Sequence, residues 1–134
     1  MRRIILAILA LFFAQPAVAA VELAAPEALA QAQAGKIVIL DVRTPGEWRQ
    51  TGIAPGAKTA DFLNSGGADA FVAQVLKAAG GNKAAPLAVV CRSGNRSAKA
   101  VALLESRGFT NLRHMGEGMN GWVGRGLPVT QWAP

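Results

Sequence analysis

Two short apolar runs constrain the fold of this chain most strongly. They read IVIL at residues 37–40 and LAVV at residues 87–90, and both are rich in β-branched residues. Continuous apolar runs of this length are typical of strands buried on both faces, whereas a strand with one wet face alternates apolar and polar residues. We therefore expect a sheet that is covered on both sides.

Segments with helical patterns lie between and around these runs. Residues 26–35 are rich in alanine and glutamine, residues 69–81 space apolar side chains along one face before two glycines, and residues 97–107 carry a further apolar stripe. Strands that alternate with helices indicate βαβ units. The sequence predicts one α/β domain with a mostly parallel central sheet flanked by helices on both faces.

Shorter elements are expected at three other places. Thr44 is a candidate helix cap, because proline follows it and Glu47 stands three residues later. A third strand is expected near residues 110–115, and one or two turns of helix near residues 119–124.

The first twenty residues have the form of an export signal. Arg2 and Arg3 precede an uninterrupted apolar segment, and small residues occupy the positions that a signal peptidase reads near Ala19. The apolar segment is about half as long as the ~20 residues that span a bilayer. We expect a signal peptide at residues 1–20 and a domain at residues 21–134 that is periplasmic or secreted, without a stable membrane anchor.

The charge of the chain favours small anionic ligands over nucleic acid. Its formal charge is +6, and removal of Arg2 and Arg3 with the signal lowers it to +4. The remaining lysines and arginines form no run of four and are not interleaved with aromatic residues, so no nucleic-acid partner is expected. A basic surface of this kind attracts anions.

The chain has one cysteine, Cys91, at the start of the sequence CRSGNRS and directly after the second apolar run. Exported proteins mostly use cysteines in pairs, so a single one is a buried spectator, an intermolecular link or a reactive thiol. Cys91 and the single histidine, His114, fall short of the four ligands of a structural zinc site. We expect neither a metal nor a cofactor.

The loop after Cys91 favours the reactive thiol. A strand, a glycine-containing loop and a helix together point backbone N–H groups at one centre, and the helix dipole and nearby guanidinium groups favour a thiolate there. A buried structural cysteine flanked by surface arginines is the alternative. The residues expected to surround the sulfur or its substrate are Arg92, Ser93, Gly94, Asn95, Arg96 and Ser97.

Two charged residues at the end of the first apolar run are expected to support this loop. The carboxyl ends of parallel strands meet at one edge of a sheet, so Asp41 and Arg43 should lie near residues 91–97. Asp41 is expected to accept hydrogen bonds and to pair with Arg43 or Arg96. His114 is interpreted as a structural residue.

Five segments in this order resemble the rhodanese family of sulfurtransferases. They are ILDVRTPGEW, GIAPGA, the loop from Cys91 to Arg96, ESRGF and GEGMNGWVGRGLPV. The resemblance implies that Cys91 takes a sulfane sulfur from an anionic donor such as thiosulfate, holds it as a persulfide, and passes it to cyanide or a thiol. It also implies that Arg96 binds loop carbonyls or the donor's sulfonate, and that Arg92 steers the donor.

Two rival functions remain open at this point. Phosphatases and arsenate reductases of related fold also use a cysteine, a loop and an arginine, although their loop is one residue longer than the one between Cys91 and Arg96. The second rival is a sulfur carrier or binding module that docks an exported protein partner and turns over slowly by itself. Many members of the resembled family also carry a histidine where this chain reads GIAPG.

Overall fold

The computed structural model describes residues 20–134, so the predicted signal lies outside the described residues except for Ala20. Within that range, no helix is both long and apolar enough to cross a membrane. Strands and helices alternate along the chain: β1 (Val21–Glu22), α1 (Ala25–Gln33), β2 (Val38–Asp41), α2 (Pro45–Thr51), β3 (Lys58–Thr59), α3 (Gly67–Ala78), β4 (Leu87–Val90), α4 (Asn95–Ser106), β5 (Leu112–His114) and α5 (Gly118–Gly124).

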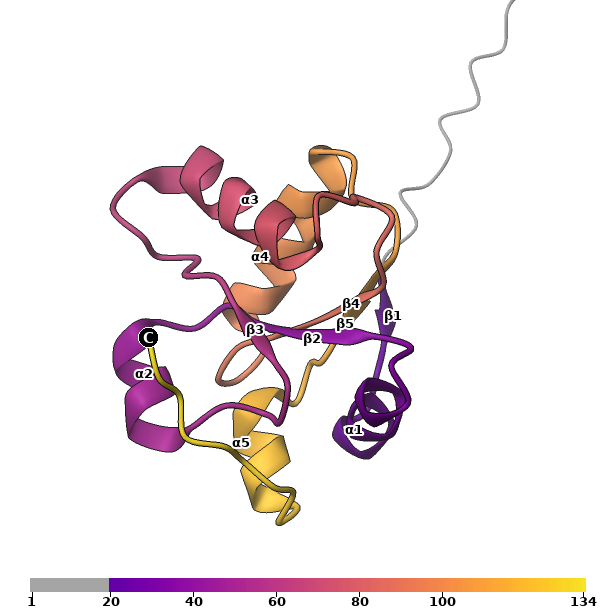
Figure 1. Cartoon of the computed structure of the whole chain (residues 1–134), viewed down its shortest axis with the longest axis vertical. Helices are drawn as coiled ribbons and strands as arrows, with labels where there is room; N and C mark the ends of the chain where they lie inside the picture. The colour runs from indigo at the N-terminus through magenta and orange to yellow at the C-terminus, as the bar shows by residue number, and fades with distance from the viewer. Residues whose placement is uncertain (1–19) are drawn as a thin grey trace, which may run out of the picture.

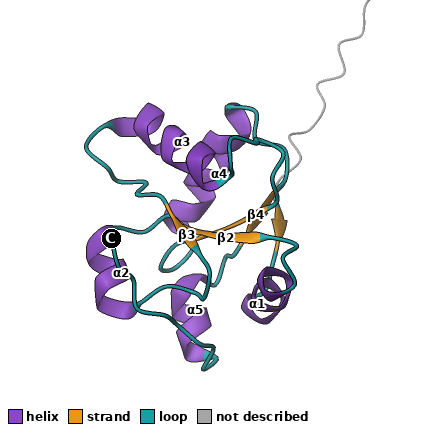
Figure 2. Cartoon of the chain, in the orientation of Figure 1, coloured by secondary structure: helices purple, strands orange, loops and turns teal. Residues whose placement is uncertain are grey.

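The described strands form one sheet in the order β1-β5-β4-β2-β3, and every neighbouring pair is parallel. Helices α3 and α4 lie on one side of the sheet, and α1 and α5 lie on the other (Figure 1, Figure 2). The predicted α/β class, with a parallel sheet covered on both faces, is therefore confirmed.

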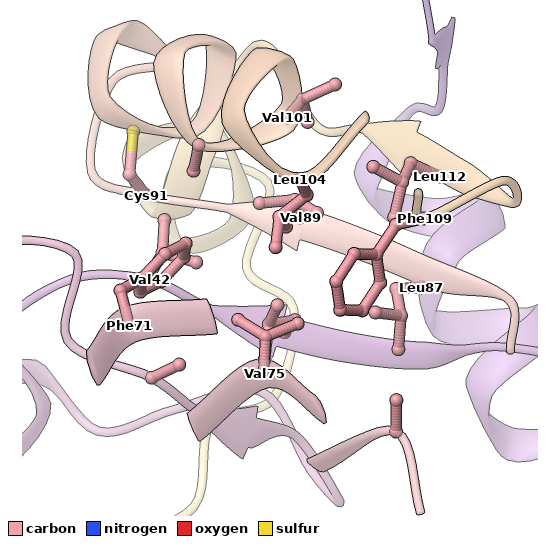
Figure 3. Close-up of a cluster of buried hydrophobic side chains, with 14 residues drawn as sticks. Val42, Phe71, Val75, Leu87, Val89, Cys91, Val101, Leu104, Phe109 and Leu112 are labelled. Atoms are coloured by element: carbon pink, nitrogen blue, oxygen red, sulfur yellow. The ribbon is translucent and has the colours of Figure 1, made fainter. Parts of the chain in front are cut away.

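The central strand β4 is buried along its whole length, which explains why its sequence has no polar residue. Its alternate side chains enter two separate cores. Leu87 and Val89 pack with Phe71 of α3 and Leu104 of α4 (Figure 3). Ala88 and Val90 join the second core, which contains Trp122 of α5.

The structure also differs from the sequence-based expectations. Helix α4 begins at Asn95 rather than at Ser97, so Arg96 lies in its first turn. The strands β1 and β3 were not predicted, because two residues are too few to show a period. They form by pairing with β5 and β2 at the two edges of the sheet.

A buried ion pair fixes the segment that follows β2. The Asp41 carboxylate is 0% exposed and accepts hydrogen bonds from the Arg43 backbone and guanidinium groups and from Nε1 of Trp48, at 2.7–3.1 Å. The Arg43 guanidinium also donates to Thr51 Oγ1 at 2.7 Å and to the Gly52 carbonyl at 2.8 Å. Of the two partners predicted for Asp41, the structure has Arg43.

Helix α2 is stabilised by a capping box at its start and by an aromatic contact to the C-terminal tail. Its capping box is formed as predicted, with Thr44 Oγ1 and the Glu47 carboxylate each accepting from the other's backbone N–H at 3.4 Å. The C-terminal tail returns beside this helix (Figure 1), where the Trp132 ring lies 5.1 Å from that of Trp48. These contacts stabilise the first turn of α2 and pack the C-terminal tail against Trp48.

Replacing Arg43 with methionine would leave a buried carboxylate without its cation. We expect the free energy of unfolding to fall by about 3–5 kcal/mol, the usual cost of breaking a buried pair, in urea titrations followed by tryptophan fluorescence. Arg107→Met is the matched control, because Arg107 pairs with the exposed Asp69 and surface pairs contribute about 0–1 kcal/mol. Equal losses in the two variants would contradict this role of the buried pair.

Candidate active site

The loop from Cys91 to Gly94 links the buried end of β4 to the start of α4. Cys91 is 1% exposed, and its sulfur points away from the aliphatic cluster toward α4 (Figure 3). Gly94 has a φ of 100°, a left-handed conformation that favours glycine, and a Cβ at this position would overlap the Gly116 carbonyl. The loop is therefore tightly packed as well as sharply turned.

The sulfur of Cys91 lies among hydrogen-bond donors. The Gly94 N–H donates to Sγ at 3.1 Å, and Sγ lies 3.2 Å from the Ser97 hydroxyl. Burial raises the pKa of the Cys91 thiol, but hydrogen bonds from the Ser97 hydroxyl and from the backbone of Ser97, Gly94 and Ser93 outweigh it, so the pKa is lowered. The arrangement favours a thiolate.

Arg96 does not make the contacts expected from the sequence. Its guanidinium forms a two-point ion pair with Glu47 of α2, with Nη1–Oε1 at 2.6 Å and Nη2–Oε2 at 2.9 Å. Of the two partners expected for Arg96, the loop carbonyls are replaced by Glu47 in this structure, and the donor's sulfonate stays a prediction. Glu47 stands 49 residues away in the chain, so only the three-dimensional approach of α2 to α4 reveals the pair.

This ion pair changes the titration of both groups. Hydrogen bonds from Arg96 lower the pKa of Glu47 from 4.5 to about 2, although burial opposes the shift. The same hydrogen bonds raise the pKa of Arg96. The pair therefore links α2 to the first turn of α4 at any pH near neutrality.

The backbone of the loop is held from the other side by α5. The N–H groups of Met119 and Asn120 donate to the carbonyls of Cys91 and Arg92 at 2.8 and 3.0 Å. A Cβ at Gly118 would overlap the Arg92 carbonyl, which explains the glycine at that position. The carbonyls of the loop therefore point toward α5. The N–H group of Gly94 in the same loop points toward the sulfur.

The remaining predicted loop residues face solvent. Arg92, Ser93 and Asn95 are exposed, and Arg92 has no carboxylate within ion-pair distance in residues 20–134. Its side chain reaches a cleft of about 520 Å³ between α2 and α5. The cleft is lined by Arg43, Glu47, Gln50, Thr51, Arg92, Met119, Asn120, Val123 and Gly124.

His114, interpreted from the sequence as structural, lies beside the loop. Its Nε2 atom is 2.8 Å from the Ser97 hydroxyl, and its Nδ1 atom is 2.6 Å from the carboxylate of Glu22. Little in the sequence indicates these contacts, because Ser97 is 17 residues away from His114 and Glu22 is 92. No cluster of three His, Cys, Asp or Glu side chains that could hold a metal occurs in the described range.

Residues 24–125 match the family model described as the rhodanese-like domain. The chain belongs to this family. The match covers all of the elements except β1, and it includes the whole loop that follows Cys91.

Relatives of this rhodanese-like domain include known sulfurtransferases. Thiosulfate sulfurtransferase 16, chloroplastic, of Arabidopsis thaliana is 37% identical over 95 residues, which are 67% of this chain and 77% of the relative. A thiosulfate sulfurtransferase from Pseudomonas aeruginosa has a TM-score of 0.69 and 25% identity, over 84% of this chain but only 20% of that one. The polysulfide-sulfur transferase homodimer of Wolinella succinogenes has a TM-score of 0.65 and 25% identity, over 85% and 80% of the two chains.

The donors around the sulfur of this rhodanese-like domain can be tested with Ser97→Ala. Loss of this hydroxyl should raise the pKa of Cys91 and slow alkylation by iodoacetamide at neutral pH, by about tenfold for each pKa unit. The measurement is the alkylation rate as a function of pH, followed by intact mass. Ser93→Ala is the matched control, since its backbone N–H is kept. A Ser97→Ala profile that coincides with the wild-type profile would count against this account of the lowered pKa.

The ion pair of Glu47 and Arg96 predicts a pH dependence of stability. Because the pKa of Glu47 is about 2 in the folded chain and 4.5 ordinarily, the unfolded chain binds this proton first as the pH falls. The stabilising contribution is complete above about pH 5 and is lost between about pH 4.5 and 2.

Glu47→Gln should therefore be less stable than the wild type at pH 7, by a difference that shrinks on acidification. The measurement is the free energy of unfolding of both proteins in urea at pH 7, 4 and 2.5. A difference that stays constant over this range would show that the ionised carboxylate contributes nothing.

Proposed function

We propose that this rhodanese-like domain transfers a sulfane sulfur from an anionic donor such as thiosulfate to cyanide or a thiol through a persulfide on Cys91. The observation that carries the proposal is the position of the only cysteine in the chain. It lies at the carboxyl end of β4, where N–H and hydroxyl donors surround its sulfur and lower its pKa.

In the first step the Cys91 thiolate attacks the outer sulfur of thiosulfate. A sulfur–sulfur bond forms between Cys91 and that sulfur, the sulfur–sulfur bond of thiosulfate breaks, and sulfite leaves with the bonding electron pair. Arg92 favours the approach of the dianion because it is exposed at the cleft and has no carboxylate partner in the described range.

In the second step the acceptor attacks the outer sulfur of the persulfide. The bond to Cys91 breaks, its electron pair returns to the cysteine, and the thiolate is restored while thiocyanate or a new persulfide leaves. Negative charge therefore stays near the loop through the cycle. The hydrogen bonds that favour the thiolate also favour the persulfide anion and the charge that moves between them.

The ion pair of Arg96 argues against the phosphatase and arsenate reductase alternative. Those reactions need a guanidinium that holds the oxygens of a tetrahedral anion. Both terminal nitrogens of Arg96 bind Glu47 instead. A ligand that recruited Arg96 would have to displace this carboxylate.

The size of the cleft between α2 and α5 is relevant to which sulfur acceptors can bind. At about 520 Å³ it is larger than thiosulfate needs, so the end of a thiol molecule fits beside the loop. An exported protein with an exposed thiol is the partner in the carrier alternative. The form of residues 1–20 supports action in the periplasm or outside the cell.

Intact-mass spectrometry of the purified chain before and after thiosulfate tests the proposal. We expect a gain of about 32 Da, one sulfur atom, that is absent in Cys91→Ser and is removed by cyanide with release of thiocyanate.

Arg92→Gln should load more slowly at low thiosulfate and at low salt, because an exposed cation acts mainly through attraction at a distance. Lys99→Gln, which removes an exposed charge from α4, is the matched control.

The outcomes separate the alternatives. Loading and unloading over many cycles supports the enzyme, whereas loading with release only to a protein thiol indicates a carrier. Failure to gain sulfur from thiosulfate or polysulfide, while the thiol still reacts with iodoacetamide, would overturn the proposal.

A further inference from the structure

The thiol of Cys91 has to lose a proton before its sulfur can attack, yet it is 1% exposed. The hydroxyl nearest to it, on Ser97, is 0% exposed. The hydrogen-bond donors around the sulfur explain why the thiolate of Cys91 is favoured over the thiol. They do not identify the group that receives the proton. At a site this buried, the proton needs an acceptor within reach of hydrogen bonds from the thiol.

Such a chain begins at Ser97. Its Oγ atom lies 3.2 Å from Sγ of Cys91 and 2.8 Å from Nε2 of His114. The hydroxyl is also 3.1 Å from the Gly94 carbonyl, which is its alternative acceptor. Ser97 therefore touches the reacting sulfur on one side and a titratable ring on the other.

Glu22 sets the protonation of that ring. Glu22 and His114 are direct partners in the register of β1 and β5, and the Glu22 carboxylate lies 2.6 Å from Nδ1. Its second oxygen accepts from the Gly116 N–H at 3.1 Å, which holds the carboxylate in place. A carboxylate so close to Nδ1 requires a hydrogen there, so Nε2 of the neutral ring faces Ser97 as an acceptor.

Exposure increases along the chain of hydrogen bonds. The side chain of His114 is 14% exposed and that of Glu22 is 67% exposed, compared with 1% and 0% for Cys91 and Ser97. A cavity of about 270 Å³ is present at the exposed end, lined by Ala20, Glu22, Ala98, Val101, Ala102, Glu105 and His114. None of these residues lines the cleft between α2 and α5.

We propose that the proton of the Cys91 thiol passes through Ser97 to His114, whose ring Glu22 orients. The thiol proton moves to Oγ of Ser97 while the proton of that hydroxyl moves to Nε2 of His114. One S–H bond breaks, one N–H bond forms, and Ser97 ends with the single proton it began with. The products are a thiolate that accepts from Ser97 and an imidazolium that donates to Ser97 and to Glu22.

This inference rests on the proposed function, because it assigns the thiolate a role as nucleophile. Ser97 acts on the sulfur directly, whereas His114 and Glu22 are positioning residues that act through it. The imidazolium lies between the Glu22 carboxylate and the new thiolate, so each charge has a partner of opposite sign. Ser97, His114 and Glu22 do not line the cleft between α2 and α5.

Other charged groups lie near these hydrogen bonds without joining them. Glu105 of α4 lines the same cavity as His114. Arg96 acts electrostatically on Cys91, and its own carboxylate partner is Glu47.

The test is the alkylation of Cys91 by iodoacetamide as a function of pH, in the full chain and without a sulfur donor. Glutamine at position 114 cannot take up a proton, so His114→Gln should move the midpoint of the profile upward and slow alkylation near neutral pH by about tenfold, or one pKa unit. Glu22→Gln should move it in the same direction by a smaller amount. Glu105→Gln is the matched control, since it removes the same charge from the same cavity but makes no hydrogen bond to His114.

The unmodified chain offers a second measurement that does not depend on a variant folding. His114 is the only histidine, so its ring signals in an NMR titration need no assignment. Alkylation of Cys91 removes the thiolate and should lower the pKa of the ring, because linkage between two sites is reciprocal. Circular dichroism of each variant checks that its fold is intact.

Two results would overturn the relay: superimposable alkylation profiles for wild type and His114→Gln together with a ring pKa that alkylation does not change, or a shift in Glu105→Gln as large as that in Glu22→Gln. The proposed function fails separately, through the absence of sulfur loading on a thiol that still alkylates. Each failure is therefore recognisable without the other.

Discussion

The buried carboxylate of Asp41 is the constraint from which the site is built. It ends β2 inside the protein, where an ionised group needs several donors, and Arg43 and Trp48 supply them. Because both donors belong to the segment that turns into α2, satisfying one buried charge also fixes the direction of that helix. The helix then carries Glu47 to Arg96, at the first turn of α4.

The loop around Cys91 is held by three elements that contact different parts of it. Helix α2 holds Arg96 through a side chain, α5 binds the carbonyls of Cys91 and Arg92, and β5 places His114 against Ser97. Contacts from three directions leave the backbone of the loop little freedom to rearrange. Donors that are already in place need no reorganisation to stabilise a charge on the sulfur.

The sequence allowed elements to be predicted where they depend on interactions between nearby residues or on a repeated apolar pattern. The apolar runs of β2 and β4 and the capping box of Thr44 have local causes. The two-residue strands β1 and β3 do not, because only pairing with longer neighbours defines them. The same limit applies to the site, where the loop follows from the sequence but the partners of Arg96 and His114 come from distant segments.

Because α5 binds the backbone of the loop, the shape of the loop and the side chains exposed beside it depend on different groups. The shape of the cradle depends on backbone N–H and carbonyl groups and on glycines at positions 94 and 118, where a side chain would collide with backbone. The exposed side chains of Arg92, Ser93 and Asn95 have no part in holding that shape. Substitutions at these three positions would therefore change the surface beside the sulfur and leave in place the backbone groups that hold the loop.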